Sequence, residues 1–110
     1  MEVAVFAVQR LTALILAPLV LVHLVVILIA VEGGLSAAEI LARTRGSIGW
    51  GAFYSLFVVA AALHAPVGLR TVIREHSVWR DRSLDIVMAF VMVLLLALGF
   101  RAVSAVVLVP

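Results

Sequence analysis

Three long apolar runs dominate the sequence, at about residues 5–31, 48–73 and 86–109. A helix that crosses the hydrocarbon core of a bilayer needs about 20 mostly apolar residues. Each run therefore predicts one transmembrane helix. The runs take up most of the chain, and no internal repeat divides it. We expect an all-α membrane protein in which residues 1–110 form a single domain of three transmembrane helices.

Polar residues separate the apolar runs and predict two short connections. In the first connection, Ser36 is followed at the third position by Glu39, which is the pattern of a capping box at the start of a helix. We therefore expect a short amphipathic helix after the first span. The second connection, residues 74–85, carries six charged side chains, so we expect it to lie in water at the membrane surface.

The charged residues are few, and their distribution predicts the topology of the chain. Only 13% of the residues are charged and 66% are hydrophobic, which excludes a soluble globular domain and a disordered chain. All eight basic residues are arginines. With the N-terminus and the second connection on one side, five arginines lie there and three lie opposite, so the positive-inside rule predicts an inside N-terminus and an outside C-terminus. We expect a multi-pass protein of the cell (inner) membrane.

Several other functions are excluded by what the chain lacks. It contains no cysteine, so disulfides and thiolate metal sites are excluded. It has no basic stripe with interleaved aromatic residues, so we expect no nucleic-acid partner. The first apolar run follows Glu2 and is too long for the apolar segment of a cleavable signal peptide. We therefore expect this run to remain in the membrane as the first span.

His64 lies inside the second apolar run, where an ionisable side chain is costly and indicates function. Helical spacing places Gly68, Thr71 and Glu75 on the same face as His64. An imidazole can ligate haem iron, and a glycine one turn away leaves room for a flat macrocycle. The residues alone leave two interpretations of His64: an axial haem ligand, or a buried histidine in an interhelical hydrogen bond.

His23 lies inside the first apolar run and has no glycine one turn away. A polar contact between helices and a haem ligand are both compatible with this position. At about 1.5 Å of rise per residue, His64 lies roughly 15 Å and His23 roughly 22 Å from the inner surface. The two histidines are therefore not expected to ligate one metal ion from opposite sides. If both bind haem, they serve two haems, each completed by another chain.

The arginines near the inner membrane surface have two possible roles. Snorkelling towards the headgroups explains most of them. Arg10, which lies between Gln9 and Thr12, is also suited to pair with a haem propionate or to donate a hydrogen bond to a quinone carbonyl. His76 lies in the second connection, where a solvated surface histidine is the simpler interpretation.

Residues 63–70, together with Glu75, resemble the second-helix motif of the membrane-anchor subunits of succinate dehydrogenase and fumarate reductase. In that motif a histidine is followed by glycine after four residues, by arginine after two more, and by an acidic residue eleven after the histidine. The matching residues in this sequence are His64, Gly68, Arg70 and Glu75. Residues 9–12 resemble the start of the first helix of the same family, and the resemblance covers nearly the whole chain.

The resemblance implies a membrane-anchor subunit of succinate:quinone oxidoreductase, within a larger helical bundle formed with a second membrane-anchor subunit. One or two haem b groups would be shared with that subunit, and quinone would be the electron acceptor in respiration. FAD on the flavoprotein subunit and clusters on the iron–sulfur subunit would perform the dicarboxylate chemistry of the tricarboxylic acid cycle. This chain would then be a non-catalytic subunit of the enzyme complex.

The resemblance also assigns roles to individual residues. His64 and His23 would be the axial ligands of haem iron, and Gly68 and Thr71 would pack against haem. Contacts with haem propionates or quinone would come from Arg10, Thr12, Arg70, Glu75 and His76. Two positions depart from the family: Phe6 replaces a serine of one anchor type, and His76 replaces a tyrosine of the other. The sequence therefore does not choose between the two anchor types.

Two alternatives belong to other functional classes. A haem-free structural membrane subunit would tolerate the loss of both histidines. A small multidrug transporter has nearly this length, but it requires four spans and a glutamate inside the first span. Glu2 and Glu32 only flank the first apolar run here, which argues against the transporter.

Overall fold

The computed structural model describes residues 2–34 and 36–108, and the regular structure within these residues is entirely helical. The helices are α1 (Glu2–Gly33), α2 (Ala37–Thr44), α3 (Ile48–His76) and α4 (Arg82–Val107). Three of them, α1, α3 and α4, are long and apolar enough to cross a membrane. The prediction of an all-α membrane protein with three transmembrane helices is confirmed.

Each long helix continues past the apolar run that predicted it. α1 begins at Glu2 rather than near residue 5, α3 ends at His76 rather than near residue 73, and α4 begins at Arg82 rather than near residue 86. Charged and polar residues extend these helices beyond the apolar part, so hydropathy alone underestimates their length. The predicted end of the third run at residue 109 lies outside the described residues.

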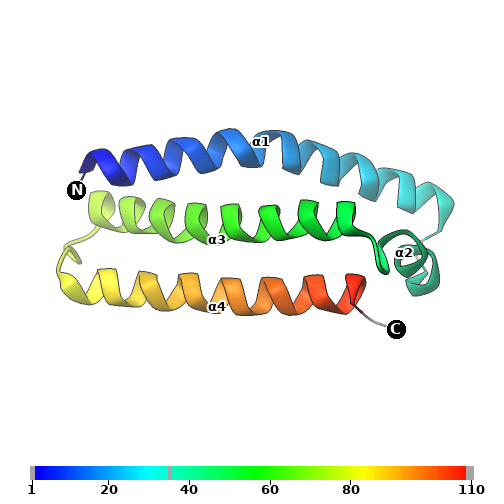
Figure 1. Cartoon of the computed structure of the whole chain (residues 1–110). Coiled ribbons are helices and arrows are strands. Elements are labelled where there is room, and N and C mark those ends of the chain that lie inside the picture. The colour runs from blue at the N-terminus through cyan, green and yellow to red at the C-terminus, as the bar shows by residue number, and fades with distance from the viewer. Residues whose placement is uncertain (1, 35, 109–110) are drawn as a thin grey trace.

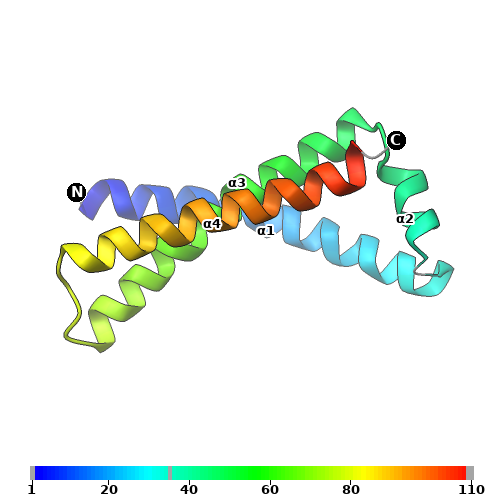
Figure 2. The same cartoon turned by 90° about the horizontal axis from the view of Figure 1, so that it is seen from below.

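α3 lies between α1 and α4 and packs against both (Figure 1). In the view turned by 90°, α1 and α3 cross near the middle of both helices, whereas the direction of α4 is closer to that of α3 (Figure 2). We call the end that contains the start of α1, the end of α3 and the start of α4 the N-terminal end. The opposite end, which contains α2, is called the α2 end (Figure 1).

Small residues allow α3 and α4 to approach each other. Ala60 and Ala62 of α3 are 3% and 1% exposed. On α4, a Cβ atom built at Gly99 would lie 2.5 Å from Cγ1 of Val58 on α3. Close backbone approach through small residues is how helices commonly associate within membranes, because lipid provides no hydrophobic driving force between them.

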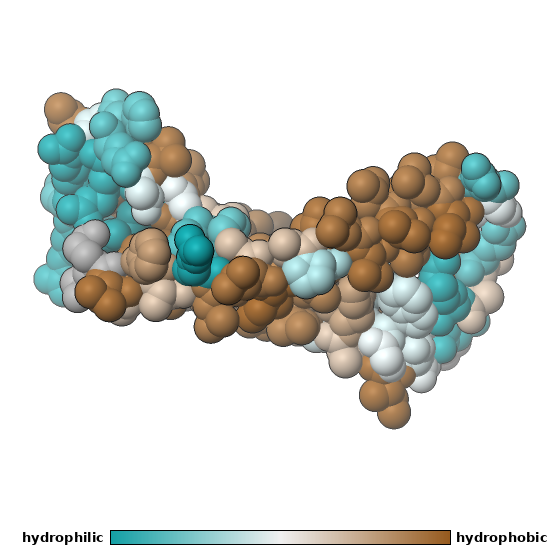
Figure 3. Space-filling view, turned by 90° about the horizontal axis from the view of Figure 1, so that it is seen from above, coloured by the Kyte–Doolittle hydropathy of each residue, from teal (hydrophilic) through white to brown (hydrophobic). Residues whose placement is uncertain are grey.

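The chain cannot bury most of its apolar side chains by itself. Large aliphatic and aromatic residues are exposed along α1 and α4. Figure 3 shows hydrophilic residues gathered mainly at the two ends of the molecule, with apolar residues between them. Exposed apolar surface of this extent is incompatible with water and fits a bilayer or a partner chain.

α2 begins as predicted and docks against the end of α4. The Ser36 hydroxyl accepts a hydrogen bond from the Glu39 amide at 3.1 Å. At the other end of α2, the buried Thr44 hydroxyl donates to the Val106 carbonyl at 2.7 Å, and the Gly46 amide donates to the Val107 carbonyl at 2.8 Å. The last carbonyls of a helix have no donor within the helix, so this connection satisfies the C-terminal end of α4.

Candidate functional site

His64 of α3 and Thr12 of α1 form a polar contact between the two helices. Oγ1 of Thr12 lies 3.0 Å from Nδ1 of His64. Thr12 is 5% exposed, and His64 is half-buried. This is the interhelical hydrogen bond that was one interpretation of His64. It uses one ring nitrogen, and Nε2 of His64 has no hydrogen-bond partner within residues 2–34 and 36–108.

Thr12 is also bonded to the backbone of its own helix. Its hydroxyl lies 2.7 Å from the Val8 carbonyl oxygen and 3.1 Å from the Gln9 carbonyl oxygen. A threonine inside a helix commonly donates its hydroxyl proton to the carbonyl one turn earlier. The Thr12 hydroxyl therefore connects the backbone of α1 to the ring of His64.

The gap at Gly68 faces the Gln9 side chain on α1. A Cβ atom at position 68 would lie 2.8 Å from Nε2 of Gln9, so the glycine makes room for this amide. Oε1 of Gln9 is buried and has no hydrogen-bond partner among the described residues. The space beside Gly68, which we expected to accommodate a haem macrocycle, thus contains the end of the flexible Gln9 side chain. Packing of Gly68 against haem stays a prediction.

His23 lies among aromatic rings nearer the α2 end. Its ring meets Phe57 edge-on at 5.4 Å and Tyr54 at 5.9 Å between centroids. Nδ1 of His23 is buried and, within the described part of the chain, has no hydrogen-bond partner. Because Phe57 precedes His64 by seven residues of one helix, the two histidine sites are separated by about 10 Å along α3.

His23 also borders a cavity of about 300 Å³. Apart from the histidine, its walls are mostly aliphatic and aromatic side chains of α2, α3 and α4, with Gly99 at its surface. This cavity is large enough to accept part of a flat hydrophobic ligand, with His23 as the one imidazole beside it.

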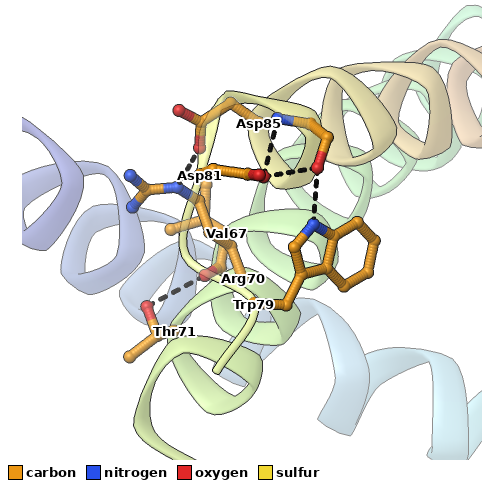
Figure 4. A network of polar contacts seen from close by, with 7 residues as sticks. Val67, Arg70, Thr71, Trp79, Asp81 and Asp85 are labelled. Carbon is orange, nitrogen blue, oxygen red and sulfur yellow. Dashed lines mark hydrogen bonds and ion pairs between the residues drawn. The ribbon is translucent and has the colours of Figure 1, made fainter. Parts of the chain in front are cut away.

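Arg70 forms an ion pair between α3 and α4 at the N-terminal end. Its Nε lies 2.6 Å from Oδ1 of Asp85. The two side chains point toward each other in Figure 4. The Arg70 side chain is 15% exposed and that of Asp85 is 50% exposed. The sequence pattern alone does not identify Asp85 as the partner of Arg70, because the two residues belong to different helices. A propionate or quinone at Arg70 would therefore share this guanidinium with a carboxylate of the same chain.

A polar cavity of about 300 Å³ adjoins this ion pair. Its lining residues are Arg70, Thr71, Arg74, Glu75 and Arg80. The structure thus brings together three of the predicted site residues of α3. Arg10 and His76 do not line this cavity: Arg10 is exposed on α1, and the exposed His76 lies with Nδ1 3.0 Å from the Val72 carbonyl.

A second polar network surrounds the start of α4. The indole Nε1 of Trp79 donates to the Ser83 hydroxyl at 2.7 Å, and that hydroxyl donates to the Asp81 carboxylate (Figure 4). The Ser83 amide also donates to Asp81 at 3.1 Å, so Asp81 is the N-cap of α4. The Ser83 hydroxyl and the backbone amides of Ser83 and Leu84 stabilise the carboxylate and hold the pKa of Asp81 below its ordinary value.

No cluster of three or more histidine, aspartate and glutamate residues that could hold a metal ion lies within residues 2–34 and 36–108. Within the described residues, neither His64 nor His23 belongs to such a group.

A family model described as succinate dehydrogenase/fumarate reductase transmembrane subunit matches residues 1–100. No curated protein and no solved structure matches the chain. The matched region contains both membrane histidines and reaches from α1 into α4.

Proposed function

Because the chain belongs to the succinate dehydrogenase/fumarate reductase transmembrane subunit family, we propose that it is a membrane anchor of succinate:quinone oxidoreductase. It attaches the flavoprotein and iron–sulfur subunits to the membrane and takes part in binding haem b and quinone. Dicarboxylate chemistry belongs to the flavoprotein. The chain itself is a multi-pass membrane protein of an enzyme complex.

The observation that carries this proposal is the state of His64. One ring nitrogen is bonded to Thr12 across the α1–α3 contact, and the other has no partner within the described residues. An imidazole nitrogen of this kind suits the axial position of haem iron. A further ligand to the haem iron would come from another membrane subunit. When bound, haem b would supply one-electron storage.

His23 is the candidate ligand of a second haem. Its buried Nδ1, which has no hydrogen-bond partner in the described part of the chain, and the adjacent apolar cavity of about 300 Å³ support this assignment. His23 of α1 packs against Phe57, about 10 Å along α3 from His64, and this separation of the two sites favours two haems over one. In contrast to His64, His23 has no hydrogen bond from the described residues, so its environment needs completion by the second anchor subunit.

The polar groups at the N-terminal end suit haem propionates and quinone. Arginine side chains form charge-assisted hydrogen bonds with carboxylates and donate to carbonyl oxygens. We assign such donating contacts to Arg10, Arg70 and His76. Glu75, with Thr71 beside it, would accept a hydrogen bond from a quinol hydroxyl. With the N-terminus inside, this end faces the iron–sulfur subunit, which delivers the electrons.

Haem counting in the complex with its partners tests the proposal. We expect a b-type absorbance band and two haems by pyridine haemochrome, one lost in His64→Ala and the other in His23→Ala. Ser104→Ala changes α4 outside both histidine sites and serves as the control. A complex without a b-type band, in which His64→Ala leaves quinone reduction unchanged, would contradict the proposal.

A haem-free structural subunit is the second candidate. The observation in its favour is the Thr12–His64 hydrogen bond, because a contact between α1 and α3 would by itself explain a histidine at this position. The same experiment separates the two. In a haem-free subunit, His64→Gln retains a polar contact and full quinone reduction. In the haem-binding subunit, His64→Gln loses the haem because an amide does not replace the imidazole ligand.

A further inference from the structure

We propose that Thr12 is a positioning residue that sets the tautomer of His64, so that Nδ1 carries the proton and Nε2 is the nitrogen available to a metal ion. The identity of that metal as haem iron rests on the proposed function. The tautomer itself is a property of this chain and can be measured without haem. We assign Thr12 this role in place of a contact with haem propionate or quinone.

The direction of each hydrogen bond at Thr12 follows from the number of protons that its hydroxyl and its three partners can donate. The Thr12 hydroxyl has one proton. Its two nearest backbone oxygens, on Val8 at 2.7 Å and on Gln9 at 3.1 Å, are carbonyls and can only accept. The hydroxyl proton is therefore committed to the backbone of α1, with the shorter bond to Val8.

The contact with His64 must then run in the opposite direction. Since its proton points to the backbone, Oγ1 of Thr12 accepts across the 3.0 Å contact, and Nδ1 of His64 donates. A neutral imidazole carries one N–H, and a charged imidazolium would be expensive inside a membrane span. The remaining lone pair is therefore on Nε2.

This arrangement prepares His64 as a ligand. Metal-binding histidines in proteins almost always donate their other ring N–H to a fixed acceptor, which holds the tautomer and the ring orientation and raises the basicity of the ligand. Thr12 is 5% exposed, so water has little access to replace the hydroxyl. In the opposite tautomer, a proton on Nε2 would block the coordinating position.

His23 provides an internal contrast. Its Nδ1 is buried without an acceptor among the described residues, so no contact in residues 2–34 and 36–108 fixes its tautomer. The effect of changing Thr12 should therefore be confined to His64.

Nuclear magnetic resonance of the full chain in haem-free lipid nanodiscs, with ¹⁵N-labelled histidine, reports the tautomer directly. We expect wild-type His64 to be in the Nδ1–H form, with its signals identified by their loss in His64→Gln. Thr12→Val removes the hydroxyl but keeps the shape, and should shift His64 towards the Nε2–H form. Thr12→Ser should retain the Nδ1–H form. Thr44→Val, which removes a buried hydroxyl at the α2 end, is the matched control and should leave His64 unchanged.

The assembled complex gives the second readout. Loss of an outer-shell partner typically weakens metal binding by about 10–100-fold, and we expect that loss of haem affinity for Thr12→Val, with Thr12→Ser close to wild type. A wild-type Nε2–H form, or no change of tautomer in Thr12→Val, would overturn the inference. The wild-type spectrum can do so even if Thr12→Val does not fold. A complex without haem, combined with the Nδ1–H form, would contradict the proposed function and support the inference.

Discussion

Gly99 determines how closely α4 approaches α3. A Cβ atom at position 99 would lie 2.5 Å from Cγ1 and 3.2 Å from Cβ of Val58. Because the Val58 Cβ atom is attached directly to the α3 backbone, a side-chain rotation cannot remove the conflict. The two helices would have to separate, and the close contact between them would be lost.

We expect Gly99→Ala to destabilise the folded chain by about 1–3 kcal/mol, the usual cost of overpacking. Gly49→Ala is the matched control, because a Cβ atom there meets only Ser47 Oγ at 3.9 Å. The free energy of unfolding in detergent micelles measures both. Equal stability of the two variants would show that α3 and α4 do not depend on this contact.

The stability of the first turn of α4 depends on pH because its N-cap, Asp81, is ionisable. The folded state holds the pKa of Asp81 below its ordinary value, so the carboxylate stabilises the fold at pH above that ordinary value, about 3.9. The contribution falls as the pH drops below about 3.9 and protons bind Asp81. Trp79 fluorescence should report the loss, because its indole is bonded to Ser83. Asp81→Asn keeps a capping side chain, and its fluorescence should not follow this titration.

Individual residues show where sequence reasoning succeeds and where it stops. His64 and His23 could be selected from the sequence as candidates because each is a polar side chain inside an apolar run, and their roles as ligands stay predictions. Their partners could not, because the contact of His64 with Thr12 depends on how α1 crosses α3. The ion pair of Arg70 with Asp85 depends in the same way on the turn between α3 and α4.

The helix α2 is held by contacts at both of its ends. Its start is capped by Ser36, and its end is tied to α4 through Thr44 and Gly46. The Arg43 guanidinium also lies over the Trp50 ring of α3, at 5.4 Å from the centroid. The sequence predicts the cap, because Ser36 and Glu39 are local. It does not predict the docking, which joins residues that are about sixty positions apart.

Gly46 is required by the backbone conformation of this connection. Its φ is +69°, and no atom of residues 2–34 or 36–108 lies within 4 Å of a Cβ built there, so among these residues a substitution meets only backbone strain. We expect Gly46→Ala to lower the free energy of unfolding by about 1–2 kcal/mol, the cost of a left-handed conformation for an L-residue. Gly33→Ala has equal free space without positive φ and should be neutral by comparison. A neutral Gly46→Ala would show that the connection can adopt another conformation.

The whole molecule is a layer of three helices in which α3 is the central one. α1 and α4 contact α3 on different sides and expose much of their apolar surface. The number of spans could be predicted, because each apolar run is long enough for a bilayer. The order of packing could not, because a hydropathy pattern does not state which helices are neighbours.

The orientation of this layer in the membrane can be tested with single cysteines, because the chain has none of its own. Val78, between α3 and α4, is 97% exposed, and Ala38 is exposed on α2. With the N-terminus inside, an impermeant maleimide added to intact cells should label Ala38→Cys but not Val78→Cys. Permeabilised cells should show labelling of both. Labelling of Val78→Cys alone in intact cells would reverse the predicted topology.

The bond from the Thr12 hydroxyl to the Val8 carbonyl has a consequence for biosynthesis. α1 leaves the ribosome before α3 exists, so its polar side chains enter lipid with only their own helix as partner. A hydroxyl that donates one turn back carries its acceptor with it and adds little to the cost of insertion. When α3 follows, the ring of His64 meets an oxygen whose proton is already directed elsewhere. α1, which precedes α3 in the chain, thus offers His64 an acceptor oxygen that is already oriented.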